Sequence, residues 1–284
     1  MDPIAASDRF WPGRRVKVTP LSGGITNHNF MVEVDGEFFV LRMGGAQTGL
    51  LGIDRAVERD AASRAAEVGV GPAVERFLEA EGWLVTRFID GRPISPERMR
   101  LPATIRRVAA ALRRFHDAPA IPGRFDSHAV VEVYHREARE RGVEIPDEYD
   151  QALLTSRQIR DARGPQRPVP CHNDLLNANF LDDGEIRIVD WEYAGMGDRF
   201  FDLANFSVNH DFGPAEDHEL LVSYFGAASE EHLLDLRRMK FMSDFREAMW
   251  GVLQSGISEL DFDFLGYAAK HFARMEANRQ TLGT

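Results

Sequence analysis

The chain is poor in the features that mark secreted, membrane-spanning or zinc-dependent proteins. Its single cysteine, Cys171, cannot form an internal disulfide, and a reducing compartment suits such a chain. The apolar runs at 38–41 and 186–189 fall far short of the roughly 20 residues that cross a bilayer, and the N-terminus has no apolar signal segment. None of the nine histidines forms a His-Glu-x-x-His pair, which disfavours a zinc enzyme. We therefore expect a cytoplasmic protein without membrane insertion.

Basic charge is also scarce, most of all near the C-terminus. The whole chain carries 34 basic and 45 acidic side chains, a net charge of −11. Residues 190–284 carry 8 basic and 17 acidic side chains (8 − 17 = −9), whereas residues 1–90 have a net charge of −3 and residues 91–189 of +1. A nucleic-acid partner needs a basic footprint, so this distribution excludes one and favours a small cation. A solvated acidic surface is the alternative explanation.

What the chain does contain is enough apolar material, 44% of its residues, for one large domain or two modest ones. The first ninety residues alternate in the manner of strands, and Asp35-Gly36 is typical of a type I′ hairpin turn. Helical spacing between Ile53 and Val68, with Asp54 at the start and Gly69 after the end, predicts one helix in this region. The expected strands are 16–21, 29–34, 38–41, 73–78 and 83–89.

Beyond Asp90-Gly91 the pattern becomes mainly helical, which predicts an α+β fold with two lobes. We assign residues 1–88 to a small antiparallel-sheet lobe and residues 89–284 to a larger helical lobe, with a hinge near 87–91. The expected helices are 102–117, 128–142, 147–163, 200–210, 215–225 and, in pieces, 229–280.

A compact insert from Val169 to Asp190 interrupts the helices. Asp183-Gly184 predicts a two-residue hairpin turn, in which Leu181 faces Ile186 and Asn179 faces Ile188. In this register Asn179 and Asp190 emerge at the same open end of the hairpin.

Asp174 lies in the loop that leads into this end of the hairpin. A carboxylate and an amide oxygen that converge there suit Mg²⁺, and a second carboxylate beside them could accept a proton from a hydroxyl. Singly, each Asp or Asn would more often cap a turn, and His172 would more often pack in a core. Together, the order His-x-Asp-x-x-x-x-Asn followed by a hairpin and Asp190 matches protein-kinase-like phosphotransferases.

These motifs resemble the choline/ethanolamine kinase family within the wider aminoglycoside-phosphotransferase group. The resemblance rests on residues 172–179, on Ile188-Val189-Asp190-Trp191-Glu192-Tyr193 and on Phe201-Asp202-Leu203-Ala204-Asn205, and it extends from about residue 18 to about residue 275. It implies a bilobal protein-kinase-like fold. It also implies that Asp174 is the catalytic base, that Asn179 and Asp190 hold Mg²⁺, and that His172 supports the catalytic loop.

The N-terminal region agrees with this resemblance. The segment from Leu21 to Asn27 is similar to the family's phosphate-covering turn, although two glycines alone would more often mark a plain hairpin. Arg42 would grip phosphate oxygens, and Glu58 would fix its position, unless Glu58 is an ordinary exposed helix residue. Arg87-Phe88-Ile89 would form the hinge that meets adenine through its main chain. The expected nucleotide-binding residues are Ser22, Gly23, Gly24, Thr26, Asn27, Arg42, Glu58, Arg87 and Ile89.

The acceptor site is expected in the last third of the chain and after Asp190. Glu247 and Trp250 share one stripe of a predicted helix, which suits an organic cation, although such aromatics are more often core residues. The resemblance places Trp250, Phe262 and Tyr267 at ammonium-binding positions. Leu253 and Asn209 depart from the family pattern, where a second tryptophan and an acidic residue are usual. The expected substrate-binding residues are Glu192, Tyr193, Glu247, Trp250, Phe262 and Tyr267.

We therefore expect an ATP- and Mg²⁺-dependent kinase that phosphorylates choline or a related amino alcohol. A kinase for an aminoglycoside, for thiamine or for another small cation is the alternative within the same reaction class. A non-catalytic choline-binding pseudokinase is the alternative of another class, which the intact Asp174, Asn179 and Asp190 disfavour. Catalysis by a Cys171 nucleophile is also disfavoured, because a lone buried cysteine usually only packs.

Overall fold

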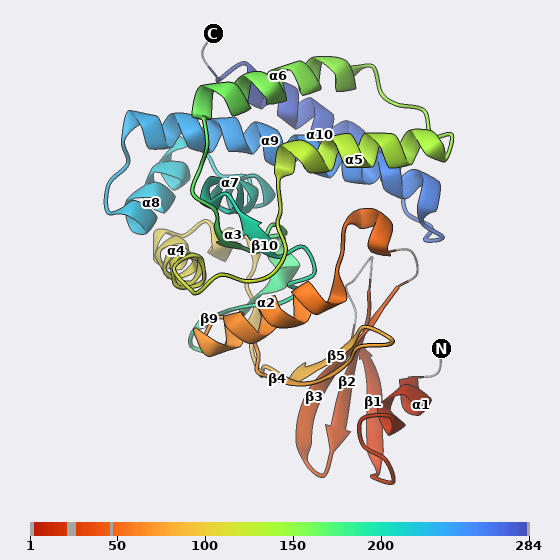
Figure 1. The fold of residues 1–284 in the computed structure, drawn as a ribbon. Coiled ribbons are helices and arrows are strands. Elements are labelled where there is room, and N and C mark those ends of the chain that lie inside the picture. The colour runs from red at the N-terminus through yellow and green to blue at the C-terminus, as the bar shows by residue number, and fades with distance from the viewer. Residues whose placement is uncertain (1–2, 22–26, 46–47, 283–284) are drawn as a thin grey trace.

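The computed structural model describes residues 3–21, 27–45 and 48–282. Its N-terminal part is an antiparallel sheet of five strands in the order β1-β2-β3-β5-β4 (Figure 1). Asp35 and Gly36 both have positive φ, 51° and 85°, and Val34 pairs with Glu37, so the predicted two-residue hairpin is confirmed. The strands are β1 (Val16–Leu21), β2 (Asn27–Val34), β3 (Glu37–Gly44), β4 (Val74–Leu78) and β5 (Trp83–Arg87).

One helix was predicted beside this sheet, and the structure confirms it and adds the short α1 and a 3₁₀ turn. The helix α2 (Arg55–Glu67) begins at Asp54, whose side chain accepts the main-chain N–H groups of Ala56 and Val57. It lies between the sheet and the helical part of the molecule (Figure 1). The short α1 (Pro3–Asp8) leads to Phe10 and Trp11, which join a small core under β1–β3 and β5. A 3₁₀ turn, η1 (Thr48–Leu51), precedes α2.

The rest of the chain is mainly helical and packs around α9 (Glu230–Ile257), a buried helix of 28 residues (Figure 1). The α+β class expected from the sequence is confirmed. The other helices are α3 (Pro96–Met99), α4 (Pro102–His116), α5 (Ser127–Glu140), α6 (Glu148–Arg163), α7 (Arg199–Asn209), α8 (Pro214–Phe225) and α10 (Phe264–Arg279). No helix in the described ranges has the length and apolar character that a membrane span needs.

Short strands lie among these helices. β7 (Val169–Cys171) pairs with β10 (Gly195–Gly197), and β6 (Arg92–Pro93) pairs with β8 (Phe180–Asp182), which in turn pairs with β9 (Ile186–Ile188). A second 3₁₀ turn, η2 (Asn177–Asn179), precedes β8. Of these strands, β7, β8 and β9 lie within the predicted insert at 169–190.

The hairpin register predicted for this insert is wrong by one residue. Leu181 faces Arg187 and Asp182 faces Ile186, so the loop has three residues, 183–185. A type I′ turn needs positive φ at both central residues. Here Gly184 has a φ of 108°, but the φ of Asp183 is not positive. Instead, the Asp182 carboxylate accepts the Gly184 N–H and two donors from Arg107 of α4, which stabilises the wider loop.

Candidate active site

The loop after β7 is held in shape by a buried carboxylate from α7. Asp202 accepts the main-chain N–H groups of His172 at 2.8 Å and of Asn173 at 2.7 Å, and its Oδ2 also lies 2.9 Å from His116 Nε2. Asn173 takes a left-handed conformation with φ 67°, which is uncommon for a residue other than glycine. Such conformations cluster at functional sites because the surrounding bonds must impose them.

His172 supports this loop through main-chain contacts. Its Nδ1 accepts the Asp174 N–H at 3.2 Å, and its Nε2 donates to the Val189 carbonyl at 3.0 Å. Burial lowers the pKa of His172, in keeping with a neutral ring that has one donor and one acceptor nitrogen. The ring therefore joins Asp174 to the hairpin as a positioning residue.

Asn179 and Asp190 present oxygen atoms at the same end of the hairpin despite the corrected register. Asn179 lines the cavity described below, and its Nδ2 donates to the Asp174 carbonyl at 2.8 Å, so its Oδ1 is the side-chain atom that can accept or ligate. Asp190 Oδ1 is buried without a hydrogen-bond partner among the described residues, and the residue has a φ of 65°. Burial, followed by the charges of Glu192, Glu58 and Asp174, raises the pKa of Asp190. An orphaned buried carboxylate oxygen beside an amide oxygen fits Mg²⁺.

A cavity of about 370 Å³ lies between the sheet and the hairpin, and Asn179 and Asp190 line it together with Arg42, Glu58 and Ile89. Volumes of this order are typical of small-molecule and cofactor sites. The cavity therefore brings the expected metal ligands and several expected nucleotide-binding residues to one place.

Arg87 and Phe88 also line this cavity, but their main-chain N–H groups are used within the protein. They donate to the carbonyls of Ala73 and Phe38 at 2.8 and 3.0 Å. The Arg87 guanidinium pairs with Glu37 and Glu75 on the sheet surface. Of the three expected hinge residues, Ile89 is thus the one whose amide these bonds leave for a ligand.

We call Asn27, Arg42, Arg55, Glu58 and Glu192 the nucleotide-side cluster. Arg42 and Arg55 each lie 2.7 Å from a different oxygen of Glu58, while Glu192 accepts from Arg55 at 3.1 Å and from Asn27 at 2.8 Å. Burial lowers the pKa of Arg42 against the opposing charge of Glu58. Glu192 was expected with the acceptor-binding residues, but the structure places it in this cluster, because its side chain reaches toward β2 and α2.

Four of the expected phosphate-covering residues, Ser22, Gly23, Gly24 and Thr26, lie outside the described residues. Asn27, at the start of β2, is described and contacts Glu192 as stated above.

We call Asp174, Tyr193, Arg246, Glu247, Trp250 and Tyr267 the acceptor-side cluster. The Arg246 guanidinium lies 4.3 Å above the Tyr193 ring, pairs with Glu247, and approaches Asp174 Oδ1 to 3.6 Å.

Hydrogen bonds between side chains complete this cluster. Trp250 Nε1 donates to the Tyr193 hydroxyl at 3.0 Å, and the Tyr267 hydroxyl donates to Glu247 at 2.8 Å. Phe262 lies at the rim, 46% exposed, with its ring 6.1 Å from that of Tyr267. Trp250 is only 7% exposed, so its ring lies beneath the surface of the cluster.

Burial and the neighbouring charges of this cluster shift the pKa of Asp174. Burial raises the pKa of Asp174 to about 7, against the opposing charge of Arg246. Burial also disfavours the charge of Glu247, but Arg246, His271 and the Tyr267 hydroxyl together lower the pKa of that carboxyl. The cluster therefore holds an ionised Glu247 beside a carboxyl that titrates near neutrality, a value suited to a general base.

Sequence reasoning missed three residues of these networks. Arg246 lies next to Glu247 on α9, about 100° around the helix, so the stripe that joins Glu247 to Trp250 leaves it out. Arg55 could have been found as the i − 3 partner of Glu58. Asp202 belongs to a quoted motif, but the pattern gave no sign that it binds main-chain amides thirty residues earlier.

The departures from the family pattern and the lone cysteine have structural roles. Leu253 is fully buried in the main core, and Asn209 Nδ2 donates to the Leu175 carbonyl at 3.4 Å. Cys171 is buried beside His116 and Asp202, and burial raises the pKa of its thiol well above the usual value. A thiol held protonated in this way is not a nucleophile.

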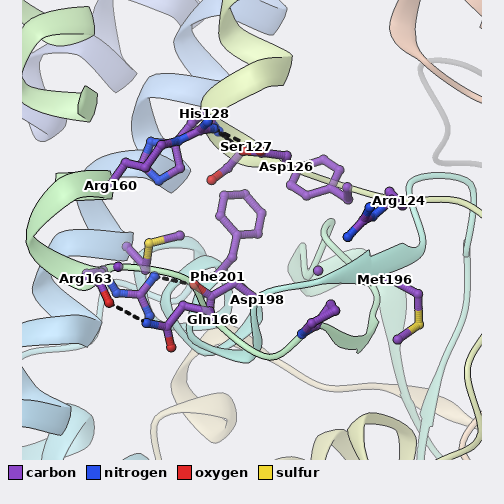
Figure 2. Close-up of a pocket in the computed structure, with 15 residues that line it drawn as sticks. Arg124, Asp126, Ser127, His128, Arg160, Arg163, Gln166, Met196, Asp198 and Phe201 are labelled. Carbon is purple, nitrogen blue, oxygen red and sulfur yellow. Dashed lines mark hydrogen bonds and ion pairs between the residues drawn. The ribbon is translucent and has the colours of Figure 1, made fainter. Parts of the chain in front are cut away.

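A second cavity, of about 510 Å³, lies on the helical part among α5, α6 and β10 (Figure 2). Its cations are largely paired within the protein: Arg160 binds Asp126 and Arg163 binds Asp198 and Asp235. None of the predicted catalytic residues lines it, so the 370 Å³ cavity is the candidate active site.

Comparisons with known proteins show the family and the fold of this chain. The model of the phosphotransferase enzyme family matches residues 17–242. Human ethanolamine kinase 2 is 24% identical over 295 residues, which cover 92% of this chain and 76% of the human protein. A crystal structure of a choline/ethanolamine kinase family protein from Mesorhizobium loti is 32% identical, with a TM-score of 0.83 over 98% of this chain and 94% of that one. The choline kinase of Streptococcus pneumoniae, 20% identical, shares the fold with a TM-score of 0.82, covering 98% of both chains.

Proposed function

This chain belongs to the phosphotransferase enzyme family and, within it, to the choline/ethanolamine kinase family, and we propose that it phosphorylates a small amino alcohol with ATP and Mg²⁺. It is a small-molecule kinase. The observation that carries the proposal is the position of Asp174, which is hydrogen-bonded to Asn179 of the nucleotide cavity and lies 3.6 Å from Arg246 of the acceptor-side cluster. Choline and ethanolamine are the reference acceptors, because the relatives named above act on them.

In the proposed reaction, the acceptor hydroxyl gives its proton to the Asp174 carboxylate as its oxygen attacks the γ-phosphorus of ATP. A new O–P bond forms, the bond from the γ-phosphorus to the bridging oxygen breaks, and ADP leaves. Arg42, held by Glu58, binds phosphate oxygens, and the Ile89 amide meets adenine. Asn179 and Asp190 would hold Mg²⁺, whose charge would offset that of the phosphates.

This proposal assigns residues 1–88 to a nucleotide-binding lobe and residues 89–284 to a catalytic and substrate-binding lobe. The cavity between the sheet and the hairpin then receives ATP. The enzyme works on soluble substrates in the cytoplasm. The aromatic rings of Trp250 and Tyr267 favour a compact ammonium group over a polyamino sugar, which would need more carboxylates.

The test is Asp174→Asn, with Asp183→Asn as the matched control in the exposed hairpin loop. We expect Asp174→Asn to reduce phosphorylation of ethanolamine and choline by roughly 1,000-fold, while the dissociation constant of ATP changes less than about threefold. The control should keep full activity. Turnover retained by Asp174→Asn would contradict the role given to this residue.

A further inference from the structure

Arg246 has an unusual position for a kinase whose acceptor is a simple cation. The guanidinium is 1% exposed, covers the Tyr193 ring and pairs with Glu247. An ammonium group would seek the same aromatic face and the same carboxylate. A protein cation therefore already occupies contacts that choline or ethanolamine would use.

The hydrogen-bonding pattern of Arg246 is incomplete on one side. Nη1 makes the closest approach to both carboxylates, Glu247 and Asp174. Nε and Nη2 are buried and have no hydrogen-bond partner among the described residues. The nearby Tyr134 hydroxyl donates its own proton to the Leu51 carbonyl at 3.1 Å and accepts a hydrogen bond from Arg246, so it serves at most one of these two donors. Buried donors are normally satisfied, so this edge indicates a missing partner.

The chemistry of that partner follows from the geometry of a guanidinium. Nε–H and Nη2–H are parallel donors on one edge, and this edge binds a carboxylate or phosphate through two hydrogen bonds. Two sources of such an oxyanion exist here: the acceptor and the transferred phosphoryl group. Arg246 does not line the nucleotide cavity, whose described lining includes Arg42, Asn179 and Asp190. Its two ion-pair partners, Asp174 and Glu247, belong to the acceptor-side cluster. The position favours the acceptor.

We propose that the Nε–Nη2 edge of Arg246 binds a carboxylate of the acceptor, so that the preferred substrate is a hydroxy amino acid. Its hydroxyl would meet Asp174, and its ammonium would meet Glu247 and the rings of Trp250 and Tyr267. The proposal rests on the function proposed above and deepens it, since the phosphoryl transfer itself is unchanged.

The sharpest test compares acceptors that differ by one carboxylate. Serine is ethanolamine with a carboxylate on the carbon that bears nitrogen, and homoserine has one more methylene. We expect the wild-type enzyme to prefer at least one of these acids to ethanolamine and choline by on the order of 100-fold in kcat/KM. A preference for ethanolamine or choline would overturn the proposal and leave the kinase function standing. If no acceptor is phosphorylated although ATP binds, the proposed function fails instead.

Arg246→Lys then separates an oxyanion-binding role from a structural one. Lysine keeps the positive charge beside Glu247 but cannot offer two parallel donors. We expect the KM of the preferred acid to rise on the order of 100-fold, so that the preference for the acid over ethanolamine in kcat/KM falls at least tenfold. Arg238→Lys, on the same helix, is the control. An equal loss with every acceptor, seen in kcat, would mean that the edge binds the phosphoryl group and would overturn the proposal.

A binding measurement on the wild-type enzyme tests the proposal even if no turnover is detected or the Arg246→Lys variant does not fold. Trp250 lies in the cluster, so its fluorescence should report titration of the wild-type enzyme with serine or homoserine in the presence of a non-hydrolysable ATP analogue. Saturable binding of an acid, with ethanolamine binding on the order of 100-fold more weakly, supports the proposal. Equal or stronger binding of ethanolamine, or no binding of either acid, overturns it.

Discussion

The nucleotide-side and acceptor-side clusters both bury arginines beside carboxylates, but they are built differently. The first joins residues of β2, β3 and α2 to Glu192, which lies 165 positions after Asn27. The second has Arg246 and Glu247 side by side on α9. In the first, Glu58 is shared by two guanidiniums, whereas in the second, Arg246 is shared by two carboxylates.

This difference predicts which cluster depends on its partners. Arg42 has one carboxylate within ion-pair distance among the described residues, Glu58, and without it the buried charge would keep only the more distant carboxylates of Asp190 and Glu192. Arg246 would keep Asp174 at 3.6 Å if Glu247 were lost. The nucleotide-side cluster should therefore be the more fragile of the two, while the acceptor-side cluster should be more sensitive in substrate choice.

The largest effect should come from Glu58→Gln. We expect the free energy of unfolding to fall by about 3–5 kcal/mol, because Arg42 loses its buried partner. Glu247→Gln should cost roughly half as much, and Glu67→Gln, at the exposed end of α2, should cost under about 0.5 kcal/mol. Urea denaturation of the three variants measures this order. An equal loss for Glu58→Gln and Glu247→Gln would break the comparison.

Arg42→Met should show that the first cluster serves the nucleotide. We expect kcat/KM for ATP to drop by about 100-fold, since a charged donor to the phosphates is lost, with the KM of the acceptor nearly constant. Arg87→Met, at the rim of the same cavity, should change either value by less than about threefold, because its guanidinium pairs only with Glu37 and Glu75 in the described structure. Initial rates over a grid of both substrates provide the measurement, and a matching rise in acceptor KM would speak against the assignment.

His210 extends the comparison to a buried titratable group that has no ion-pair partner in the described part of the chain. Burial among Phe180, Phe206 and Phe212 lowers its pKa to about 4. The folded state therefore favours the neutral ring, and the stability that this gives is present above pH 6.5 and is lost as the pH falls toward 4.

The loss should be about 2 kcal/mol between pH 7 and pH 5. Thermal denaturation of His210→Gln at both pH values should show a smaller acid destabilisation than the wild type. His218→Gln, on an exposed face of α8, should keep the wild-type pH dependence. The same slope in all three proteins would rule out His210 as its source.

The smallest effect is expected at the rim. Phe262→Ala removes an exposed ring near Tyr267, so the KM of the acceptor should rise about threefold while the KM of ATP stays the same. An exposed residue elsewhere on the surface, such as Leu154, gives a matched control. A change in ATP affinity with Phe262→Ala would show that the two sites are less separate than their contacts indicate.

Local pattern was enough to predict most of the fold. Alternation and turn residues located β1 and β2, and caps such as Asp54 located α2 to within about two residues. The length of the hairpin loop at 183–185 was predicted wrongly, because Asp182 is bound by Arg107, which lies about 75 positions earlier. No local rule contains such a contact.

The residues of the candidate site likewise fall into those that a short-range pattern predicts and those that it does not. The spacing of Asp174, Asn179 and Asp190 is a short-range signal, and the structure brings these residues together at one cavity and its loop. The partners of Arg246 come from three separate parts of the chain, and the positions of Glu192 and Tyr193, adjacent in sequence, point to different clusters. Glu192 and Tyr193 are the central residues of a turn closed by the hydrogen bond from the Ala194 N–H to the Trp191 carbonyl, and the motif alone does not predict where the side chains of such a turn point.

The hydrogen bonds of Asp202 affect which amino-acid substitutions this protein tolerates. Its carboxylate fixes two consecutive amides of the catalytic loop and a histidine of α4, although it never faces the cavity. In a saturation mutagenesis map scored by growth or product yield, α7 would therefore resemble a catalytic segment. Inherited changes at this helix would silence the enzyme while its substrate-binding residues remained intact.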